Sequence, residues 1–517
     1  MKRQISDIIT STLAGFLPQG VNLPEVTVEV PKNAEYGDFS TNAALLLAKS
    51  LRQPPFEIAE KIVAEIKKKP QKIFSEISAF KNGFINFKIS FEFLQNNLKT
   101  ILKEKQKYGR NKTGKGKKVL IEFVSANPTG PLHVGHGRWA VIGDDIASLF
   151  EACGYKVDRE YYVNDRGNQI KLLEKSVKAA ANGSPVPEGG YGGSYIKEIA
   201  DDLKDHKQLL PYILSKQKET LAKLKVIFDS YFSEKTLHDE GLVEDAISRL
   251  SSEGHTIREG GALWFKSEAF GDDKNRVLVK ENGELTYFAA DIAYHINKFK
   301  RGYDIIIDIW GADHHGYVPR VKAALAAVGL PIDRFEVIIG QLVTLYRGKE
   351  QVKMSKRTGE MVTLDEIISE IGSDAVRFFM TSTSVNNHLD FDLELAKEKK
   401  QENPVYYVQY AHARICSILR KSKCKVQSAK LDTLTHEAER ALMRKLLDFE
   451  DEILAACRKR EPHQLINYVK DVAAIFHNFY HQCRVLDNPA RLVLVEATRI
   501  VIENVLKLLK IEAPEQM

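Results

Sequence analysis

Cysteine is scarce in this chain. Its 517 residues include five cysteines, and no two of them form a CxxC pair. They are Cys153, Cys416, Cys424, Cys457 and Cys483. An odd, scattered set argues against a disulfide framework and gives no zinc-ligand spacing. We therefore expect reduced thiols, no structural metal and a cytoplasmic protein.

Long apolar runs are missing as well, and neither sign of charge dominates. No stretch is long and apolar enough to span a bilayer. The run after Met1-Lys2-Arg3 is interrupted by Asp7, which is typical of an amphipathic helix rather than a signal peptide. The 75 basic and 69 acidic residues give a formal net charge of +6. Such a small excess permits a nucleic-acid partner without requiring one, because a solvated basic surface produces the same excess.

The chain is too long for a single hydrophobic core, so we expect several domains. Residues 1–107 mix helical periodicity with strand-like runs such as Val26–Val30, which indicates an α+β domain. A charged stretch that contains glycines, from Lys103 to Lys118, is typical of a linker. Residues 396–517 contain few glycines and much helical periodicity, which predicts an all-α domain.

The middle block, residues 108–395, predicts a parallel sheet. The apolar run Val119–Val124 is followed by a Pro/Gly loop, a helical pattern that Gly154 is placed to end, and the strand-like run Tyr155–Val163. Strand, loop, helix and strand in succession are the pattern of a βαβ unit. A Gly/Ser/Pro-rich start followed by charged helical sequence indicates an insertion at about 181–275.

The strongest local motif lies between that first strand and the helix. It reads Pro131-Leu132-His133-Val134-Gly135-His136-Gly137. Because Gly135 and Gly137 lack side chains, a phosphate or an adenine can approach the backbone N–H groups at the helix start. His133 and His136 can share a helical face and donate to a polyphosphate. A metal-binding pair or a chance pair of polar histidines is the alternative, which the strand–loop–helix setting disfavours.

A second motif follows the strand-like run Phe335–Val343. It reads Val352-Lys353-Met354-Ser355-Lys356-Arg357-Thr358-Gly359. Ammonium groups on such a loop can close over the negative charge that develops on a pyrophosphate leaving group. Taken alone, the charge run fits a solvated surface loop equally well.

Together, the two motifs resemble the paired signatures of the class I aminoacyl-tRNA synthetases, usually written HIGH and KMSKS. His133-Val134-Gly135-His136 and Lys353-Met354-Ser355-Lys356-Arg357 each differ from the signature at one residue. The resemblance implies a multidomain α/β protein whose catalytic domain is a Rossmann-like, doubly wound parallel sheet. It also implies that ATP, with Mg²⁺, activates an amino acid as an adenylate before transfer to tRNA.

The resemblance also assigns roles within the two motifs. It implies that His133 and His136 assist the phosphates of ATP, and that Lys353 and Lys356 stabilise the pyrophosphate. The other residues that it places at the ATP are Gly135, Gly137, Met354 and Ser355. Because such a reaction needs no covalent enzyme intermediate, catalysis would consist of positioning and electrostatic stabilisation.

The segment before the histidine motif, Ile121 to Leu132, resembles that of the arginyl-tRNA synthetases. A guanidinium substrate needs planar acceptors, and carboxylates suit it best. Tyr287 and Asp291 are one helical turn apart. The resemblance implies that Asp291 is the charge partner of the guanidinium and that Tyr287 lines its pocket. Without that context, Asp291 fits an ordinary exposed carboxylate on a helix.

The same resemblance implies contacts to the other end of the substrate. It places Glu122, Asn127 and His133 at the α-amino and carboxylate groups, and Asp313 at a further substrate contact. Considered by itself, Glu122 fits a surface residue at the end of a strand.

Segments near both ends of the chain indicate tRNA binding, less specifically than the two motifs indicate the ATP site. The segment Tyr406 to Arg414 resembles the anticodon-binding domain of the family, and Tyr410 with Arg414 sets an aromatic ring beside a cation, which suits unstacked bases. The resemblance adds Tyr480 and Met517, although a tyrosine at helical spacing is more often a core residue. The segment Tyr36 to Asn42 resembles the added domain that meets the tRNA elbow.

The expected partners are therefore tRNA(Arg), L-arginine and ATP, with no membrane and a monomeric chain, the usual form of the family. Two alternatives stay open at this point. One is another class I synthetase or a related nucleotidyltransferase, although no zinc-binding cysteine cluster of the cysteinyl or methionyl kind is present. The other is a tRNA-binding paralogue without catalytic activity, although none of the motif histidines and lysines is missing.

Overall fold

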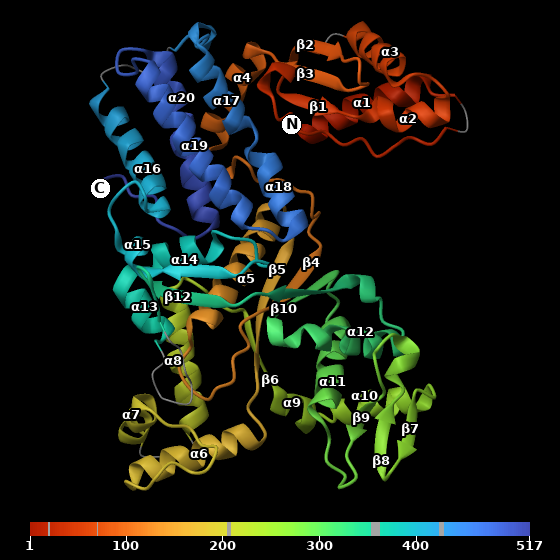
Figure 1. Ribbon diagram of the computed structural model, residues 1–517, viewed down its shortest axis with the longest axis vertical. Coiled ribbons are helices and arrows are strands. Elements are labelled where there is room, and N and C mark those ends of the chain that lie inside the picture. Colours follow the sequence, from red (N-terminus) through yellow and green to blue (C-terminus); the bar gives the residue numbers. More distant parts are fainter. Residues whose placement is uncertain (19–20, 70, 204–207, 353–361, 423–428) are drawn as a thin grey trace.

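The structure is a computed structural model that describes residues 1–18, 21–69, 71–203, 208–352, 362–422 and 429–517. Figure 1 shows three parts: an N-terminal α+β domain in red and orange, a middle part built on a sheet, and a helical C-terminal domain in blue. The expected multidomain α/β architecture is therefore present. Within the described ranges, no helix is long and apolar enough to cross a membrane.

The central sheet has five parallel strands in the order β11-β10-β4-β5-β6. They are β4 (Lys118–Glu122), β5 (Lys156–Val163), β6 (Ser230–Ser233), β10 (Ile305–Gly311) and β11 (Phe335–Gly340). The chain runs outward from β4 to β6 and then returns to β10 on the other side of β4. The strand order thus reverses between β4 and β10, and ligands of doubly wound sheets bind at the carboxyl ends of the strands at such a point.

Helix α5 (Val134–Ala152) follows β4 and is buried on nearly all sides. The helix ends just before Gly154, as expected, and the φ of Gly154 is +82°. Any other residue at this position would place its Cβ 2.9 Å from the carbonyl oxygen of Asn111. Asp144 and Asp145, in the middle of the helix, both contact the guanidinium of Arg377, and all three side chains are shielded from solvent. Lys510, just beyond the last helix of the chain, donates to Asp144 at 2.6 Å.

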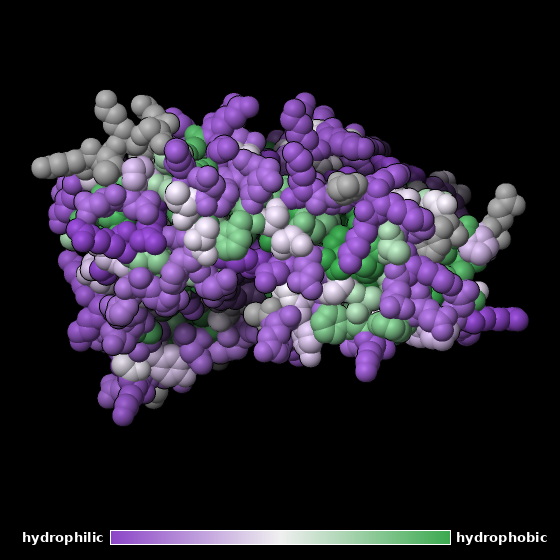
Figure 2. Space-filling model, turned by 90° about the horizontal axis from the view of Figure 1, so that it is seen from above, coloured by the Kyte–Doolittle hydropathy of each residue, from purple (hydrophilic) through white to green (hydrophobic). Residues whose placement is uncertain are grey.

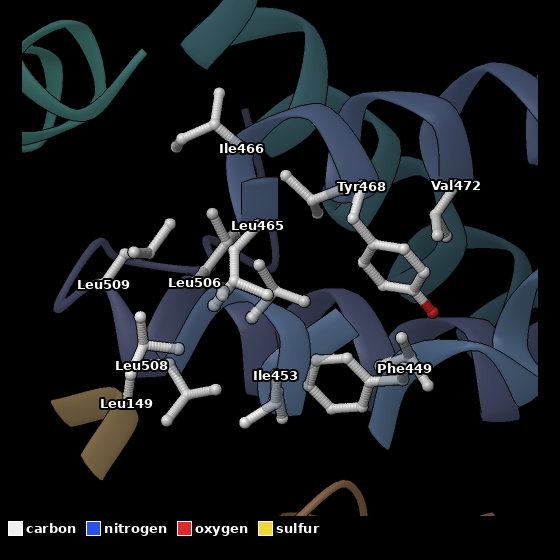
Figure 3. Close-up of a cluster of buried hydrophobic side chains, with 14 of the residues drawn as sticks. Leu149, Phe449, Ile453, Leu465, Ile466, Tyr468, Val472, Leu506, Leu508 and Leu509 are labelled. Carbon is white, nitrogen blue, oxygen red and sulfur yellow. The ribbon is translucent and has the colours of Figure 1, made fainter. Parts of the chain in front are cut away.

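The C-terminal half of α5 enters the core of the helical domain. This domain consists of α16 (Pro404–Lys421), α17 (Glu437–Leu447), α18 (Phe449–Lys459), α19 (His463–Gln482) and α20 (Pro489–Leu508). In Figure 3, Leu149 of α5 lies among side chains of α18, α19 and α20 such as Ile453, Leu465 and Leu508. The central sheet and the helical domain therefore share one hydrophobic core.

Two excursions leave the central sheet. Between β5 and β6 run α6 (Asn168–Ala181), α7 (Ser194–Asp202) and α8 (Leu209–Lys223). Between β6 and β10 run α9 (Glu234–Asp239), α10 (Leu242–Ser252), the antiparallel strands β7 (Thr256–Glu259), β8 (Ala262–Phe265) and β9 (Arg276–Val279), and α11 (Tyr287–Lys300). The single insertion expected at 181–275 is thus divided by β6, a short strand of the main sheet that periodicity did not reveal.

After β10 come α12 (Val318–Ala327) and β11, and then a second, smaller sheet in the order β13-β12-β14. Its strands are β12 (Val343–Arg347), β13 (Glu350–Gln351) and β14 (Leu389–Asp392), with α13 (Leu364–Ile371) and α14 (Ser373–Thr381) before β14 and α15 (Leu393–Lys397) after it. This sheet and α13 border the gap in the described chain at 353–361.

The N-terminal domain is an antiparallel sheet, β1-β3-β2, with helices packed on it. Its elements are α1 (Lys2–Phe16), β1 (Phe39–Thr41), α2 (Ala43–Leu51), α3 (Pro55–Lys68), β2 (Phe74–Ala79) and β3 (Ile85–Ile89), and α4 (Phe91–Glu104) leads out of it. The run Val26–Val30 is not a strand and forms only one isolated bridge, from Glu29 to Ser40. Pro24 and Pro31, which flank it, cannot donate to a strand ladder.

The charged stretch from Lys103 to Lys118, expected as a linker, is packed against the helical domain. Tyr108 is buried, its hydroxyl donates to the carbonyl oxygen of Leu446 at 3.2 Å, and its own carbonyl accepts from Asn504 at 3.2 Å. Burial of Tyr108 and its hydrogen bonds therefore hold this stretch against the helical domain, although the charged residues of the stretch suggested a free linker.

Asp38 ties the N-terminal domain to α17 of the helical domain. Its carboxylate accepts from Arg440 at 2.6 and 3.1 Å, lies 3.6 Å from Arg444, and also accepts from the backbone N–H of Ile89 at 2.7 Å. Both domains appear in Figure 2, which views the molecule from above and shows a mostly hydrophilic face with small apolar patches.

Replacing Asp38 with alanine should loosen this attachment. Removing one partner of a buried ion pair costs about 3 kcal/mol, because the remaining charge loses its counter-charge. We expect faster hydrogen exchange in β3 and α17 of D38A, measured by mass spectrometry. Glu35→Ala, which removes a nearby exposed carboxylate, is the matched control, and equal exchange in the two variants would contradict the assignment.

Candidate active site and nucleic-acid interface

The histidine motif forms the start of α5 at the switch point of the sheet. His133 is the N-cap residue, and its Nδ1 accepts from the backbone N–H of Gly135 at 3.1 Å. His136 Nδ1 accepts from the backbone N–H of His133 at 3.3 Å, and the two rings stack with centroids 3.7 Å apart. The two imidazoles therefore lie side by side at the positive end of the helix dipole.

The two glycines of the motif have different surroundings. Among the described residues, a Cβ on Gly135 would meet only the ring of His133, whereas a Cβ on Gly137 would lie 2.6 Å from the side chain of Leu364 on α13. Gly137 is therefore needed for close packing between α5 and α13. The expectation that Gly137 also adjoins the nucleotide stays a prediction.

Lys353, Met354, Ser355 and Lys356 lie outside the described residues, but the chain on either side of them is described. Before them, Val352 donates to Leu345 at 2.9 Å in the β12–β13 hairpin. After them, Thr363 forms a β-bridge with His133, and the N–H of Leu364 donates to Leu132 at 2.8 Å. The chain that follows the lysine motif therefore lies directly beside the histidine motif.

Arg138, the residue after Gly137, connects α5 to the small sheet that precedes the lysine motif. Its guanidinium is shielded from solvent and donates at 2.8–3.3 Å to five oxygens. Those oxygens are the carbonyls of Gln341, Leu342, Ser384 and Asn387 and the hydroxyl of Thr383. Burial lowers the pKa of Arg138 to about 10, so the group stays charged at neutral pH.

Glu122 is the last residue of β4 and is 6% exposed. One carboxylate oxygen accepts from the hydroxyl of Ser125 at 2.8 Å, and the other contacts the ammonium of Lys298 on α11. The backbone after it turns through Val124 and Ser125, whose φ values of 68° and 38° are left-handed. Two such residues in succession, one of them β-branched, store strain of the kind found at functional sites.

Asn127 lies in the exposed part of the same loop. Its side-chain amide donates to Gln169 at 2.9 Å, and its carbonyl oxygen accepts from the buried Gln217 of α8 at 3.3 Å. Gln217 also donates to the carbonyl of Gly130 at 2.9 Å, so α8 holds the loop between Glu122 and the histidines.

Asp291 lies on α11, and its carboxylate accepts from the hydroxyl of Tyr317. Burial raises the pKa of Asp291, whereas the Tyr317 hydrogen bond lowers it. Tyr287, one turn earlier, is 60% exposed, and its hydroxyl lies against Gly167 in the loop after β5. Both side chains border the space next to the carboxyl end of β5.

A second carboxylate, Glu234, faces the same space and was missed from the sequence. It begins α9, is 5% exposed, and accepts from the hydroxyl of Tyr162 at 3.0 Å. Burial raises the pKa of Glu234, the hydrogen bond from Tyr162 lowers it, and the charge of Asp291 raises it again. The available signal was its position directly after β6, at the carboxyl edge of the sheet.

Asp313 points into solvent. It lies in the 3₁₀ helix η5 (Ala312–Tyr317), its side chain is 82% exposed, and it lies 3.5 Å from His314. Tyr317, at the other end of the same short helix, reaches Asp291 instead. Because a 3₁₀ helix is tightly wound, Asp313 and Tyr317 point to different sides of it. The sequence could not show which of the two points inward.

The helical domain carries an aromatic surface on α16 and α19. Tyr410 stacks on Tyr406, with ring centroids 6.1 Å apart, and the guanidinium of Arg414 lies 4.6 Å from the ring centre of Tyr480. Arg414 and Tyr480 line a cavity of about 400 Å³ with four other residues, Gln401, Tyr407, His477 and His481. Met517 is 56% exposed and lines a neighbouring hollow that also includes Tyr406.

Known proteins match each of the three parts. The arginyl tRNA synthetase N terminal domain matches residues 3–89, the class I (R) tRNA synthetase catalytic domain matches 97–186 and 194–415, and the DALR anticodon binding domain matches 408–517. The chain is 46% identical to the arginine–tRNA ligase of Desulforudis audaxviator, over 97% of this chain and 95% of the relative. The chain belongs to the arginyl-tRNA synthetase family.

Other similarities extend over the full length. The arginine–tRNA ligase of Heliobacterium modesticaldum is 44% identical, over 100% of this chain and 99% of the relative. The structure of Thermus thermophilus arginyl-tRNA synthetase superposes with a TM-score of 0.82 at 25% identity, covering 100% of both chains. The expected family is thereby confirmed, and a synthetase of another class I family is excluded.

Changing Arg138 to lysine should slow adenylate formation without weakening tRNA binding. A lysine has three rotatable donors and cannot supply the five-contact fork that joins α5 to the small sheet. We expect at least about a 10-fold lower kcat in arginine-dependent pyrophosphate exchange, with an unchanged Kd for tRNA in filter binding. Arg334→Lys, at an exposed arginine, is the control, and full exchange activity in R138K would refute this role.

Proposed function

We propose that the pocket containing Asp291 and Glu234 holds the guanidinium of L-arginine and that Glu122 holds its α-ammonium group. The enzyme ligates arginine to tRNA(Arg) through an arginyl-adenylate, with release of AMP and pyrophosphate. The observation that carries the proposal is a pair of separate acidic positions, Asp291 near the start of α11 and Glu122 of β4, which contacts Lys298 near the end of that helix. Arginine is a substrate with a positive charge at each end of an extended chain, and each charge meets its own carboxylate.

At the guanidinium end, two carboxylates and two tyrosine hydroxyls surround one space. Tyr162 and Tyr317 donate to Glu234 and Asp291 respectively, which orients both acids before the substrate arrives. A planar guanidinium can then donate to the two carboxylates along different edges. Tyr287 covers the outer side of this pocket, consistent with its exposed ring.

At the other end, Glu122 accepts from the α-ammonium group, while Asn127 and His133 contact the substrate carboxylate. That carboxylate is the nucleophile which attacks the α-phosphate of ATP, so the loop from Glu122 to His133 joins the arginine and ATP sites. Catalysis consists of holding the two reactants in line, since the described groups around the site orient the substrates without forming a covalent bond to them.

ATP, with Mg²⁺ as its substrate complex, occupies the start of α5. His133 and His136 donate to its phosphates, and the backbone at Gly135 lies next to it, where the helix dipole favours an anion. Lys353 and Lys356 neutralise the pyrophosphate as it leaves, and Met354 and Ser355 belong to the same ATP contact. Support for the lysines comes from Thr363, which bridges to His133 just after them.

The tRNA lies along the two flanking domains. Tyr410, Arg414, Tyr480 and Met517 contact the anticodon, because stacked rings beside a guanidinium can hold unstacked bases without base pairing. We assign residues 1–107 to the tRNA elbow, 108–395 to catalysis and 396–517 to the anticodon.

We also propose that the enzyme acts as a monomer in the cytoplasm. The N-terminal and helical domains dock through contacts within the chain, such as that of Asp38 with Arg440. The described cysteines, Cys153, Cys416, Cys457 and Cys483, are free thiols, which suits a reducing compartment.

Lys356→Ala should lower the rate of adenylate formation far more than it lowers tRNA affinity. A lost ammonium group removes stabilisation that exists only when pyrophosphate develops charge, so a fall of about 100-fold in kcat for pyrophosphate exchange is expected. Lys349→Ala removes an exposed lysine shortly before the motif and should be neutral. Equal losses in exchange and tRNA affinity would identify the loop as a tRNA-binding surface without a catalytic role.

Glu234→Gln should raise the KM for arginine about 10- to 100-fold, as should Asp291→Asn, because each variant removes one charged acceptor. Arginine-dependent charging of total tRNA measures this. Asp239→Asn changes an exposed acid at the far end of α9 and serves as the control. If D291N raises the KM and E234Q does not, Glu234 is not part of the pocket.

A further inference from the structure

Lys298 is a fully buried lysine with no role in the contacts proposed above. Its side chain lies on α11 at 0% exposure, donates to Asp308 of β10 at 2.7 Å and contacts Glu122 of β4. The ammonium also lies 4.3 Å from the ring centre of Tyr294. Burying a charged amine is costly unless its partners repay the desolvation, so this lysine is held in place by its two carboxylates.

Each of the two acids that contact Lys298 has a second polar partner. His295 Nε2 lies 2.9 Å from Asp308, and its Nδ1 lies 2.7 Å from the carbonyl oxygen of Asp291. Because both of these partners accept, an imidazole that donates to both is a cation and supplies a counter-charge to Asp308. Glu122 has only the Ser125 hydroxyl besides Lys298 among its described hydrogen-bond partners, so Lys298 is the counter-charge of Glu122.

Helix α11 presents these groups in one row. Asp291 and Lys298 are two helical turns apart and so project from the same side, and Tyr287 lies one turn before Asp291. One rigid helix thus carries the guanidinium partner near its start and the ammonium group that contacts Glu122 near its end. The spacing along this helix fixes the distance between the two acidic positions.

We infer that Lys298 is a positioning residue, which orients Glu122 and keeps it ionised so that the enzyme recognises the α-ammonium group of its substrate. This inference rests on the proposed role of Glu122. It makes recognition of the amino-acid end of arginine depend on a residue that does not touch the substrate. The preference of the enzyme for arginine over guanidino acids without an α-amino group would then depend on Lys298.

The surroundings of Glu122 explain why the lysine is needed. Burial raises the pKa of Glu122 and the negative charge of Asp308 raises it further, whereas Lys298 and the Ser125 hydroxyl lower it. The two neighbouring phenols donate to other acids, Tyr294 of α11 to Glu160 at 2.8 Å and Tyr162 of β5 to Glu234 at 3.0 Å. When the lysine is removed, the added proton belongs on Glu122, because His295 still stabilises the charge of Asp308. A neutral Glu122 does not attract an ammonium group.

Lys298→Met keeps the length of the side chain and removes its charge. Calorimetry on the full chain would compare L-arginine with 5-guanidinopentanoic acid, which has the same guanidinium and carboxylate but no α-amino group. We expect K298M to bind arginine about 10- to 100-fold more weakly at neutral pH, and 5-guanidinopentanoic acid with little change. Lys300→Met, at an exposed lysine on the same helix, should bind both ligands like the parent enzyme.

The pH dependence gives a second readout that a general disturbance of the fold would not produce. In K298M the pKa of Glu122 lies higher than in the parent enzyme, so the acid is neutral below that pKa and charged above it. Arginine affinity of K298M should therefore recover as the pH rises, with its midpoint at least about one pH unit above that of the parent enzyme. Binding of 5-guanidinopentanoic acid should show no such recovery.

The outcomes separate the inference from the role of Glu122 itself. If Glu122→Gln leaves the preference for arginine over 5-guanidinopentanoic acid unchanged, Glu122 does not hold the α-ammonium group and both proposals fail. If E122Q abolishes the preference and K298M retains it, only the role of Lys298 is overturned. Equal weakening of both ligands in K298M, with no dependence on pH, would show a purely structural lysine and would also overturn it.

Discussion

The contact of Arg377 with Asp144 and Asp145 is the junction on which the arrangement of the domains depends. The guanidinium also donates to the carbonyl oxygens of Leu224, just after α8, and Leu509, just after α20. Buried charges are tolerated only when every partner is present, so this junction is stable only when α5, α8, α14 and α20 are all in place. The helix that begins with the histidine motif is thereby fixed to the helical domain, and Figure 1 shows α5 between the sheet and that domain.

The proposed substrate site differs, because two of its acids have hydroxyls as partners where Asp144 and Asp145 have a guanidinium. Around Arg377 each charge finds its counterpart within the protein, whereas Asp291 and Glu234 accept from the hydroxyls of Tyr317 and Tyr162. In the proposed complex, the guanidinium of the substrate supplies their counter-charge. An amino acid with a neutral or acidic side chain would leave Asp291 and Glu234 without a counter-charge. The proposed site would therefore select arginine by the cost of burying unpaired charges as much as by its shape.

The sequence predicted what local patterns encode. The alternation of strand, loop and helix around His133 and Gly154 specified the parallel sheet, and the resemblance selected Glu122 and Asp291, whose role at the site stays a prediction. The sequence did not reveal Glu234 or Tyr317, because their positions depend on how elements far apart in the chain pack together. The packing of Leu364 against Gly137 was missed for the same reason, since the two residues are far apart in the chain.

The unbalanced acids of the substrate site have a consequence for the lifetime of the protein as well as for its chemistry. An unpaired buried carboxylate favours unfolding, and a ligand that binds only the folded chain stabilises it in proportion to the logarithm of its concentration. By this linkage, arginine bound at the proposed site raises the free energy of unfolding of the chain. The empty protein then unfolds, and meets proteases, more readily than the loaded one.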